Sequence, residues 1–421
     1  MSLKKYLVSG AAALAILGTA ATAVTIEQDG TGDYLVAPAY YAVANWSTEL
    51  KVVNTNTTHA VVAKVVIREA NQSKEILDFP IYLTPGDVWV GTIYQDEDGI
   101  VKVKSTDDSL MLGIDRNESG DFVGPVLKGD EVDGGIVLPT YDKEGAIPTR
   151  GYVEVYGLAA YNADCLDDAN CTNESFSEGC ALDKKKMYVR VRDENKTTNL
   201  TTNCEASDVD SDALLGKQTI FAESDDVNGR RAMMLNMFAM GDAQQEPWVE
   251  NVLGTDTVVP TALQTGVVTE LAKSSIYVMY EGDGTEIYPM RTHFTAPFNA
   301  NNLYSINEAN MSFRDLSEDA QWCAKPACVQ TGPEDTDPYA DTSGRTESEC
   351  PVHTYEEVGI IFNHDPAAGV SDPLLGQYGF NVGGYIDIKP EPSASVIPTT
   401  FYAKKLGDIY LNNHLYNQYK K

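Results

Sequence analysis

The chain has 421 residues, 43% of them hydrophobic, and its 62 acidic and 31 basic residues give a formal net charge of −31. This apolar content excludes a largely disordered chain. The negative charge repels nucleic acid and anionic lipid and attracts divalent cations, so neither nucleic acid nor a lipid surface is an expected partner. The 23 tyrosines, the 33 glycines and many β-branched residues favour a mainly β protein.

The N-terminal segment predicts export. Lys4 and Lys5 precede an apolar run that ends at Ala20, and residues 21–23 have the small side chains of an A-x-A signal peptidase site. A membrane span is the competing interpretation, but this run is short, and no later stretch is long enough to cross a bilayer. We therefore expect residues 1–23 to be a signal peptide and the mature chain to work outside the cytoplasm, at the outer cell surface, in the medium or in the periplasm.

Residues 24–143 predict an N-terminal antiparallel β-sandwich domain, because short strands alternate with turn residues. In the run from Ala60 to Arg68, alternate side chains should face opposite sides of a sheet, with Val65 on one side and Lys64 on the other. Asp98-Gly99 is typical of a hairpin turn. The expected strands are 34–43, 50–53, 60–68, 76–83, 88–94 and 100–103.

Residues 144–388 predict a second β-rich domain, with strands expected at 152–158, 187–191, 276–280, 358–362 and 385–388. One or two short helices are also expected. The first spans 230–240, where four methionines recur at helical spacing, and the second spans 316–321. Residues 389–421 should form a Pro-containing linker and a Tyr-rich tail.

All seven cysteines lie in two acidic, loop-like insertions, residues 161–212 and 323–350. No C-x2-C pair suggests zinc, and in an exported chain the expected role is disulfides that staple the long loops. The first insertion can form two local bridges. The second has an odd thiol that pairs with the first insertion, links subunits or stays free. The disulfide candidates are Cys165, Cys171, Cys180, Cys204, Cys323, Cys328 and Cys350.

Two groups of aspartates are candidate Ca²⁺ sites, and calcium is the only cofactor that the sequence suggests. Asp208, Asp210 and Asp212 have the D-x-D-x-D spacing of an oxygen-ligand loop, although Ala213 and Thr219 break the EF-hand pattern that would follow. A second, more loosely spaced set consists of Asp335, Asp337 and Asp341. The acidic run 96–98 offers the same chemistry. The alternative interpretation is a set of solvated acidic loops.

Nine N-x-S/T sequons suggest glycosylation. Five have an acidic residue two positions earlier, as bacterial oligosaccharyltransferases require, namely Asn71, Asn117, Asn170, Asn195 and Asn310. An exported chain that is never glycosylated is the alternative. No catalytic motif accompanies these sites: the five histidines are scattered, and there is no nucleophile elbow, phosphate loop or dinucleotide fingerprint. We therefore expect a non-enzyme, although abundant carboxylates leave a glycosidase pair open.

The stretch from Leu77 to Trp89, LDFPIYLTPGDVW, resembles segments of uncharacterised exported β-rich proteins of environmental bacteria, a similarity that covers residues 33–93 and implies no activity. In overall character the chain is similar to surface-layer proteins, with a leader, a low pI and cation and glycan candidates, although no S-layer homology module is present. This resemblance implies a self-assembling structural protein of the bacterial surface.

The sequence leaves three functions open. A cation-bridged homo-oligomeric layer or fibre is the first, with strand edges at 24–33 or in the Tyr-rich tail free to pair with a neighbour. The second is an adhesin or glycan-binding module, with exposed aromatics as contacts and Trp46, Trp89, Trp248 and Trp322 as candidates. The third is a secreted hydrolase, for which no residue can be named.

Overall fold

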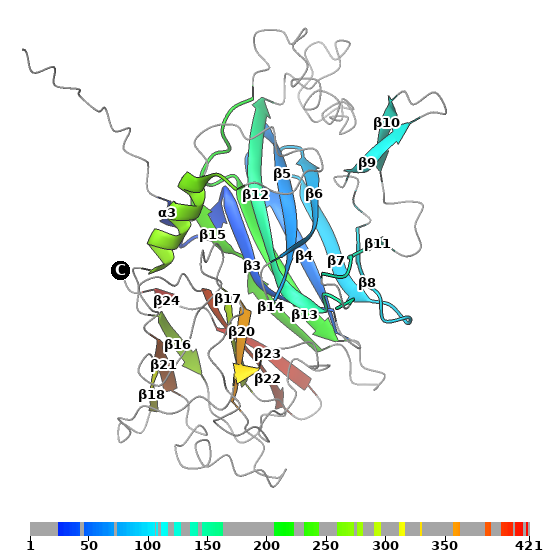
Figure 1. Ribbon diagram of the computed structural model, residues 1–421. Helices are drawn as coiled ribbons and strands as arrows, with labels where there is room; N and C mark the ends of the chain where they lie inside the picture. The colour runs from blue at the N-terminus through cyan, green and yellow to red at the C-terminus, as the bar shows by residue number, and fades with distance from the viewer. Residues whose placement is uncertain are drawn as a thin grey trace, which may run out of the picture.

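The computed structural model describes residues 24–42, 46–70, 74–105, 107, 111–116, 122–127, 135–141, 145–162, 206–222, 231–243, 259–272, 276–280, 290–295, 311–315, 329–330, 357–362, 384–388, 397–406, 409–415 and 418–419. The protein is mainly β, as its composition predicts, and its strand pairs are antiparallel (Figure 1).

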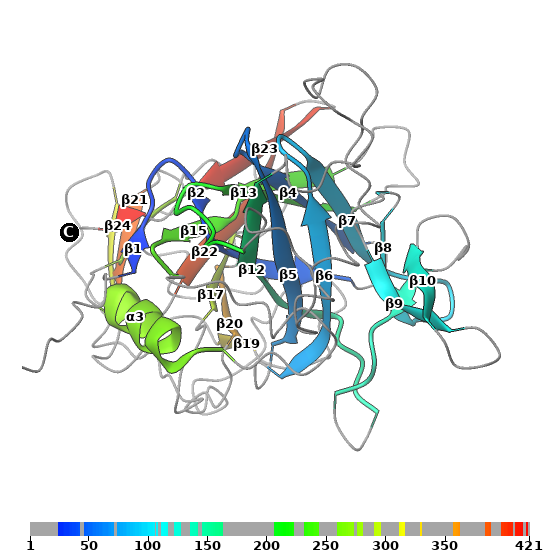
Figure 2. The same cartoon turned by 90° about the horizontal axis from the view of Figure 1, so that it is seen from above.

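Two large sheets form a sandwich from residues 24–243. Sheet I has the order β1 (Thr25–Ile26), β15 (Phe238–Gly241), β3 (Tyr34–Tyr41), β12 (Arg150–Asn162), β5 (His59–Glu69) and β6 (Glu75–Leu83). Sheet II has the order β11 (Ile136–Val137), β8 (Val101–Lys104), β7 (Val88–Gln95), β4 (Trp46–Asn54), β13 (Leu214–Ala222) and β14 (Arg231–Asn236), with β2 (Thr31–Gly32) also paired to β13. Figure 2 shows the two layers from above.

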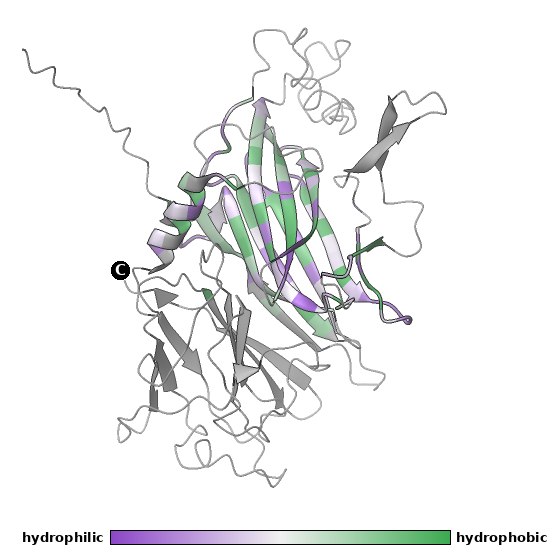
Figure 3. Ribbon diagram, viewed as in Figure 1, coloured by the Kyte–Doolittle hydropathy of each residue, from purple (hydrophilic) through white to green (hydrophobic). Residues whose placement is uncertain are grey.

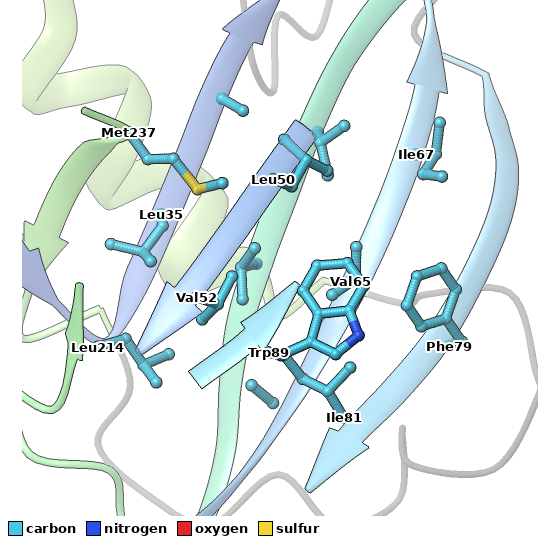
Figure 4. Packing of buried hydrophobic residues seen from close by; sticks show 14 of the residues in the cluster. Leu35, Leu50, Val52, Val65, Ile67, Phe79, Ile81, Trp89, Leu214 and Met237 are labelled. Carbon is cyan, nitrogen blue, oxygen red and sulfur yellow. The ribbon is translucent and has the colours of Figure 1, made fainter. Parts of the chain in front are cut away.

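The core between the sheets follows from the two-residue period of strands. Val65 and Ile67 point inward from sheet I, while Val52 and Trp89 point inward from sheet II, and all four are buried (Figure 4). Lys64, between the inward positions Ala63 and Val65, lies on the opposite face of β5, as the sequence predicts.

The other face of sheet I is buried as well. Tyr34, Val62 and Tyr156 on this face pack in a second cluster with Val267 of the helix α3 (Thr261–Ala272). Strands β3 and β12 are therefore buried on both sides over nearly their whole length. Sheet II differs, because β4 alternates between buried and half-buried positions and leaves one face to solvent. Figure 3 shows how apolar and polar bands alternate along these strands.

The sandwich takes strands from both sides of the boundary that the sequence suggests after residue 143. Strand β12 pairs with β3 on one side and with β5 on the other, and β13 pairs with β4. The boundary therefore falls inside the sandwich, because the central strands of both sheets need these later partners for their backbone hydrogen bonds. The insertion 161–212 connects β12 in sheet I to β13 in sheet II.

The predicted helix at 230–240 is wrong. This segment forms β14 and β15, with Met237 between them; β14 pairs with β13 and β15 with β3. Its methionines do not share a face: Met237 lies in the inter-sheet core, Met240 lies in the second cluster and Met234 is exposed. Pairing with existing strands overrides the helical spacing. The helix of the described region is α3, which follows Pro260 and was not expected.

The C-terminal third contributes two further sheets. One has the order β18 (Met311–Asp315), β21 (Gly384–Ile388), β16 (Ile276–Tyr280) and β24 (Gln418–Tyr419). The other has the order β19 (Val329–Gln330), β20 (Glu357–Phe362), β17 (Met290–Thr295), β22 (Ile397–Leu406) and β23 (Ile409–Leu415). The predicted strands at 276–280, 358–362 and 385–388 are confirmed. A separate hairpin is formed by β9 (Met111–Arg116) and β10 (Phe122–Leu127).

Both segments suggested as free strand edges are paired within the chain. In the segment 24–33, β1 pairs with β15 and β2 pairs with β13. In the segment 389–421, β22 pairs with β17 and β23, while β24 pairs with β16. The expected strand 187–191 and the expected helix 316–321 lie outside the described residues. Within the described region, no helix is long and apolar enough to cross a bilayer.

The packing around Trp89 predicts a large stability effect. Its indole is fully buried and lies 5.8 Å, centroid to centroid, from the ring of Phe79 in the facing sheet. We expect Trp89→Ala to lower the free energy of unfolding by about 3–5 kcal/mol, because a cavity opens between the sheets. The matched control is Val88→Ala, one residue earlier and 38% exposed, with an expected change of about 0.5 kcal/mol or less. Urea unfolding followed by circular dichroism measures both, and equal effects would contradict this account of the core.

Candidate functional site

The first candidate site is a set of charged and phenolic side chains inside the second cluster, on the face of sheet I that points away from sheet II. We call it the polar cluster, and its members are Tyr34, Lys64, Arg68, Asp78, Glu154 and Tyr156. The side chain of Glu154 is fully buried; its Oε1 accepts a hydrogen bond of 2.7 Å from the Tyr34 hydroxyl, and its Oε2 contacts Nε of Arg68. The charge of Glu154 is thus matched by an adjacent cation and an O–H donor.

Strand register brings the polar cluster together. Tyr156 of β12 lies opposite Tyr34 on one side and opposite Lys64 on the other. Val66 lies opposite both Glu154 and Asp78, so these two acids are diagonal neighbours of Lys64 on either side. Nζ of Lys64 contacts Oδ2 of Asp78, and Nη2 of Arg68 lies 3.8 Å from Oε2 of Glu75.

The electrostatics of the polar cluster favour fixed protonation states. Burial, followed by the negative charge of Glu154, raises the pKa of Tyr34 and that of Tyr156 well above 10. Burial would lower the pKa of Arg68, but its interactions with Glu154, Tyr156 and Tyr152 together outweigh burial and hold that pKa well above its ordinary value. The two phenols therefore stay neutral and Arg68 stays charged at physiological pH. The cluster can hold charges in place inside the protein, which suits a structural role.

The second candidate site is the outward face of sheet II. Along the strands of this sheet, outward-facing positions alternate with the inward residues of the core. Four outward positions are lysines: Lys51 on β4, Lys102 and Lys104 on β8, and Lys217 on β13. We call this surface the lysine face. Together with β7, which lies between β4 and β8, these strands present one outward acid, Glu49, although the whole chain has twice as many acids as bases.

The lysine face is open to contact. Lys104 and Lys217 are exposed, and the side chain of Lys51 is 44% exposed although it pairs with Glu49 at 3.1 Å. Lys51 and Lys217 are directly opposite on neighbouring strands, where like charges repel. Apolar side chains are exposed on the same strands and at their edges, namely Val88, Val137 and Met234. Charge and apolar area together are typical of a protein-binding surface.

Sequence reasoning missed both candidate sites for the same reason. Lys51 and Lys217 are far apart in the sequence, and only the pairing of β4 with β13 brings them together. Glu154 and Arg68 meet only because β12 pairs with β5. The one local signal was the alternation in 60–68, which places Lys64 and Arg68 on the same face of β5.

The Asp208, Asp210 and Asp212 set lies in the loop that leads into β13. Val209 between the first two is buried in the core, so the loop is anchored, while the three aspartates are exposed. Oδ2 of Asp210 accepts a hydrogen bond of 2.8 Å from Nδ2 of Asn56. Among the described residues, no three His, Cys, Asp or Glu side chains gather as a metal-binding group. Calcium binding therefore stays a prediction, and Asp335, Asp337 and Asp341 lie outside the described residues.

The third acidic group has a local structural role. Oδ1 of Asp96 accepts hydrogen bonds from the backbone N–H groups of Asp98 (3.1 Å) and Ile100 (2.8 Å), and Lys102 pairs with Oδ2 at 2.5 Å. The hydrogen bond from Lys102 and those from the backbone lower the pKa of Asp96. Asp96 thus closes the β7–β8 hairpin that the sequence predicts at Asp98-Gly99.

Most of the remaining candidates cannot be placed. All seven cysteines and the five preferred sequons, at Asn71, Asn117, Asn170, Asn195 and Asn310, lie outside the described residues, as do Trp248 and Trp322. Trp46 and Trp89 are buried in the sandwich, so neither is a surface contact for a glycan. The sequon residue Asn56 holds the β4–β5 turn, since its Oδ1 accepts hydrogen bonds from the backbone N–H groups of Thr58 (2.9 Å) and His59 (2.8 Å).

Comparisons with family models, curated proteins and solved structures give no match. The roles of the polar cluster and the lysine face must therefore be inferred from their own geometry and chemistry.

The buried pair of Glu154 and Arg68 predicts that removing one charge is costly. Glu154→Gln keeps the shape but leaves Arg68 without its buried counter-charge, so we expect the free energy of unfolding to fall by about 3–5 kcal/mol. Glu49→Gln breaks the more exposed pair with Lys51 and should cost about 1 kcal/mol or less. Chemical denaturation at pH 7 measures both, and a Glu154→Gln effect no larger than the control would contradict the role of this pair.

The raised pKa values of Tyr34 and Tyr156 predict alkaline sensitivity. The folded state holds these phenolic protons more tightly than the unfolded state, so their contribution to stability is complete below pH of about 10 and is lost as the pH rises further. We expect the urea midpoint to be constant from pH 7 to 9 and to fall steeply above pH of about 10. Tyr34→Phe removes one of the two groups and should make that fall shallower. An unchanged slope in the variant would show that Tyr34 does not contribute.

Proposed function

We propose that this chain is an exported structural protein of the bacterial cell surface that assembles with copies of itself into a layer or fibre. The observation that carries the proposal is the lysine face, an open surface with four lysines on a chain of net charge −31. Lys51 pairs with Glu49 and Lys102 with Asp96, while Lys104 and Lys217 are exposed. Such a surface is complementary to the acidic remainder of a second copy. Contact between two different surfaces of the same chain repeats from copy to copy and extends into rings or filaments.

The sandwich supports this role because its strands share continuous sheets and two buried clusters. Sheet I is buried on both faces, and its backbone hydrogen bonds join strands that begin at residue 25 and end at residue 241. We further propose that the leader routes the chain out of the cytoplasm, and that disulfides staple the insertions 161–212 and 323–350. Calcium bridging between acidic loops and glycans at the five preferred sequons complete the proposal, and both depend on export.

A binding module for an anionic glycan is the second candidate, and it uses the same surface. Lys51 and Lys217 lie side by side on adjacent strands. Thr92 and Thr219, whose hydroxyls face outward, lie opposite Glu49 on the two strands that neighbour β4. Carboxylate or sulfate groups on a polysaccharide would pair with such lysines as point charges. A third candidate, a secreted hydrolase, has no named catalytic residue.

Assembly of the chain from Val24 onward tests the proposal. Sedimentation and negative-stain microscopy should show ordered assemblies with calcium at low salt, which dissolve in EDTA because the acidic surfaces then lose their bridging ions. Charge reversal by Lys51→Glu with Lys217→Glu should raise the concentration needed for assembly at least ~10-fold, a cost of about 1.4 kcal/mol per contact. The control is Lys74→Glu, at the β5–β6 connection and away from the lysine face.

The outcomes separate the candidates. A wild-type chain that stays monomeric with calcium at low salt contradicts self-assembly. Assembly that is unchanged by the double reversal leaves self-assembly in place and excludes the lysine face as the contact. A monomer that binds acidic polysaccharides through Lys51 and Lys217 establishes the binding module instead.

A further inference from the structure

We propose that Lys64 and Asp78 become joined by a covalent amide bond, so that β5 and β6 carry a side-chain cross-link in the mature protein. Lys64 is fully buried, and among the described lysines it is the only buried one. It lies on the second-cluster face of β5, opposite Tyr156 on one neighbouring strand and Pro80 on the other. A lysine in such surroundings keeps its amine out of bulk water, which would otherwise solvate the nucleophile.

The partner group is already in place. Nζ of Lys64 contacts Oδ2 of Asp78, its diagonal neighbour on β6. This oxygen is itself buried and accepts no hydrogen bond of ordinary geometry from the described residues. Two ladder-bonded strands hold both side chains at fixed positions. Holding an amine against a carboxyl group in this way replaces a bimolecular encounter with an intramolecular one, which is worth several orders of magnitude in rate.

The chemistry needs no added reagent. Proton transfer from the ammonium group to the carboxylate converts the ion pair into a neutral amine and a carboxylic acid. Nζ then forms a bond to Cγ of Asp78, the bond from Cγ to the protonated oxygen breaks, and one amine proton leaves with that oxygen as water. The Asp78 side chain is 16% exposed on the edge strand β6 and offers the released water a way out.

Such a bond suits the position of β6. This strand is the last in sheet I and has one described partner, β5. A covalent link through Lys64 and Asp78 closes the loop between the two strands and restricts the unfolded chain, as a disulfide does. Unlike a disulfide, an amide does not depend on the redox state of the compartment.

Mass spectrometry of the full mature chain tests the proposal directly. After expression without glycosylation and complete reduction of thiols, we expect a mass lower by about 18 Da than the sequence mass, equal to one water. Trypsin should then yield peptide 52–68, uncut at Lys64, joined to peptide 75–102. A full sequence mass with separate peptides 52–64 and 75–102, after prolonged incubation of the folded protein, would overturn the proposal.

Variants assign the bond to these two side chains. Lys64→Arg keeps the positive charge but lacks the amine, and Asp78→Ala lacks the carboxyl group, so both should show the full mass even if they fold poorly. Asp78→Asn should form the same amide with loss of ammonia, about 17 Da. A mass deficit that persists in Lys64→Arg would place the bond elsewhere and overturn the assignment. The exposed pair of Lys51 and Glu49 on sheet II provides a control, because Lys51→Arg should leave the deficit unchanged.

Discussion

The structure depends on the burial of both faces of sheet I. Strand β12 hydrogen-bonds to β3 and to β5, and nearly all of its residues are buried. A strand in this position has no solvent to satisfy its polar groups, so every backbone and side-chain group needs a protein partner. The inter-sheet face meets this demand mainly with apolar side chains, and the Tyr40 hydroxyl there donates a hydrogen bond to the backbone carbonyl of Pro148. The opposite face meets it with tyrosines and matched charges.

This difference between the faces explains why charged residues lie in the interior. Glu154 would be very costly to bury alone, and its contacts with Arg68 and the Tyr34 hydroxyl make it tolerable. A buried ionic network of this kind adds little net stability compared with an apolar core. It does specify register, since slipping β12 by one residue would move Glu154 into the apolar inter-sheet core. The polar cluster therefore favours one alignment of β12 with its neighbours β3 and β5.

Local pattern predicted many of the strands but not their partners. The run 60–68 alternates clearly, and the structure confirms both of its faces because each follows from the two-residue period. The helix predicted at 230–240 is wrong because the structure of this segment depends on which distant strands it joins, and the pairing of strands across residue 143 is decided in the same way. The methionine spacing in 230–240 fits a helix, but hydrogen bonds offered by β13 and β3 decide the outcome. The residues of the polar cluster and of the lysine face come from segments that are far apart in the sequence, so no local sequence pattern indicates either site as a whole.

Charge distribution links the fold to the proposed assembly. A chain of net charge −31 repels its own copies at long range, and a uniform acidic surface would keep it monomeric. Sheet II concentrates lysines on its one open face, since the inward positions of the same strands carry apolar or uncharged polar side chains and the charges lie outward. Sheet I has no such open face, and its charges are internal and paired. The sandwich thus places its internal ionic contacts in one sheet and its outward positive charge in the other. A subunit that must stay rigid while it binds an acidic neighbour needs both properties.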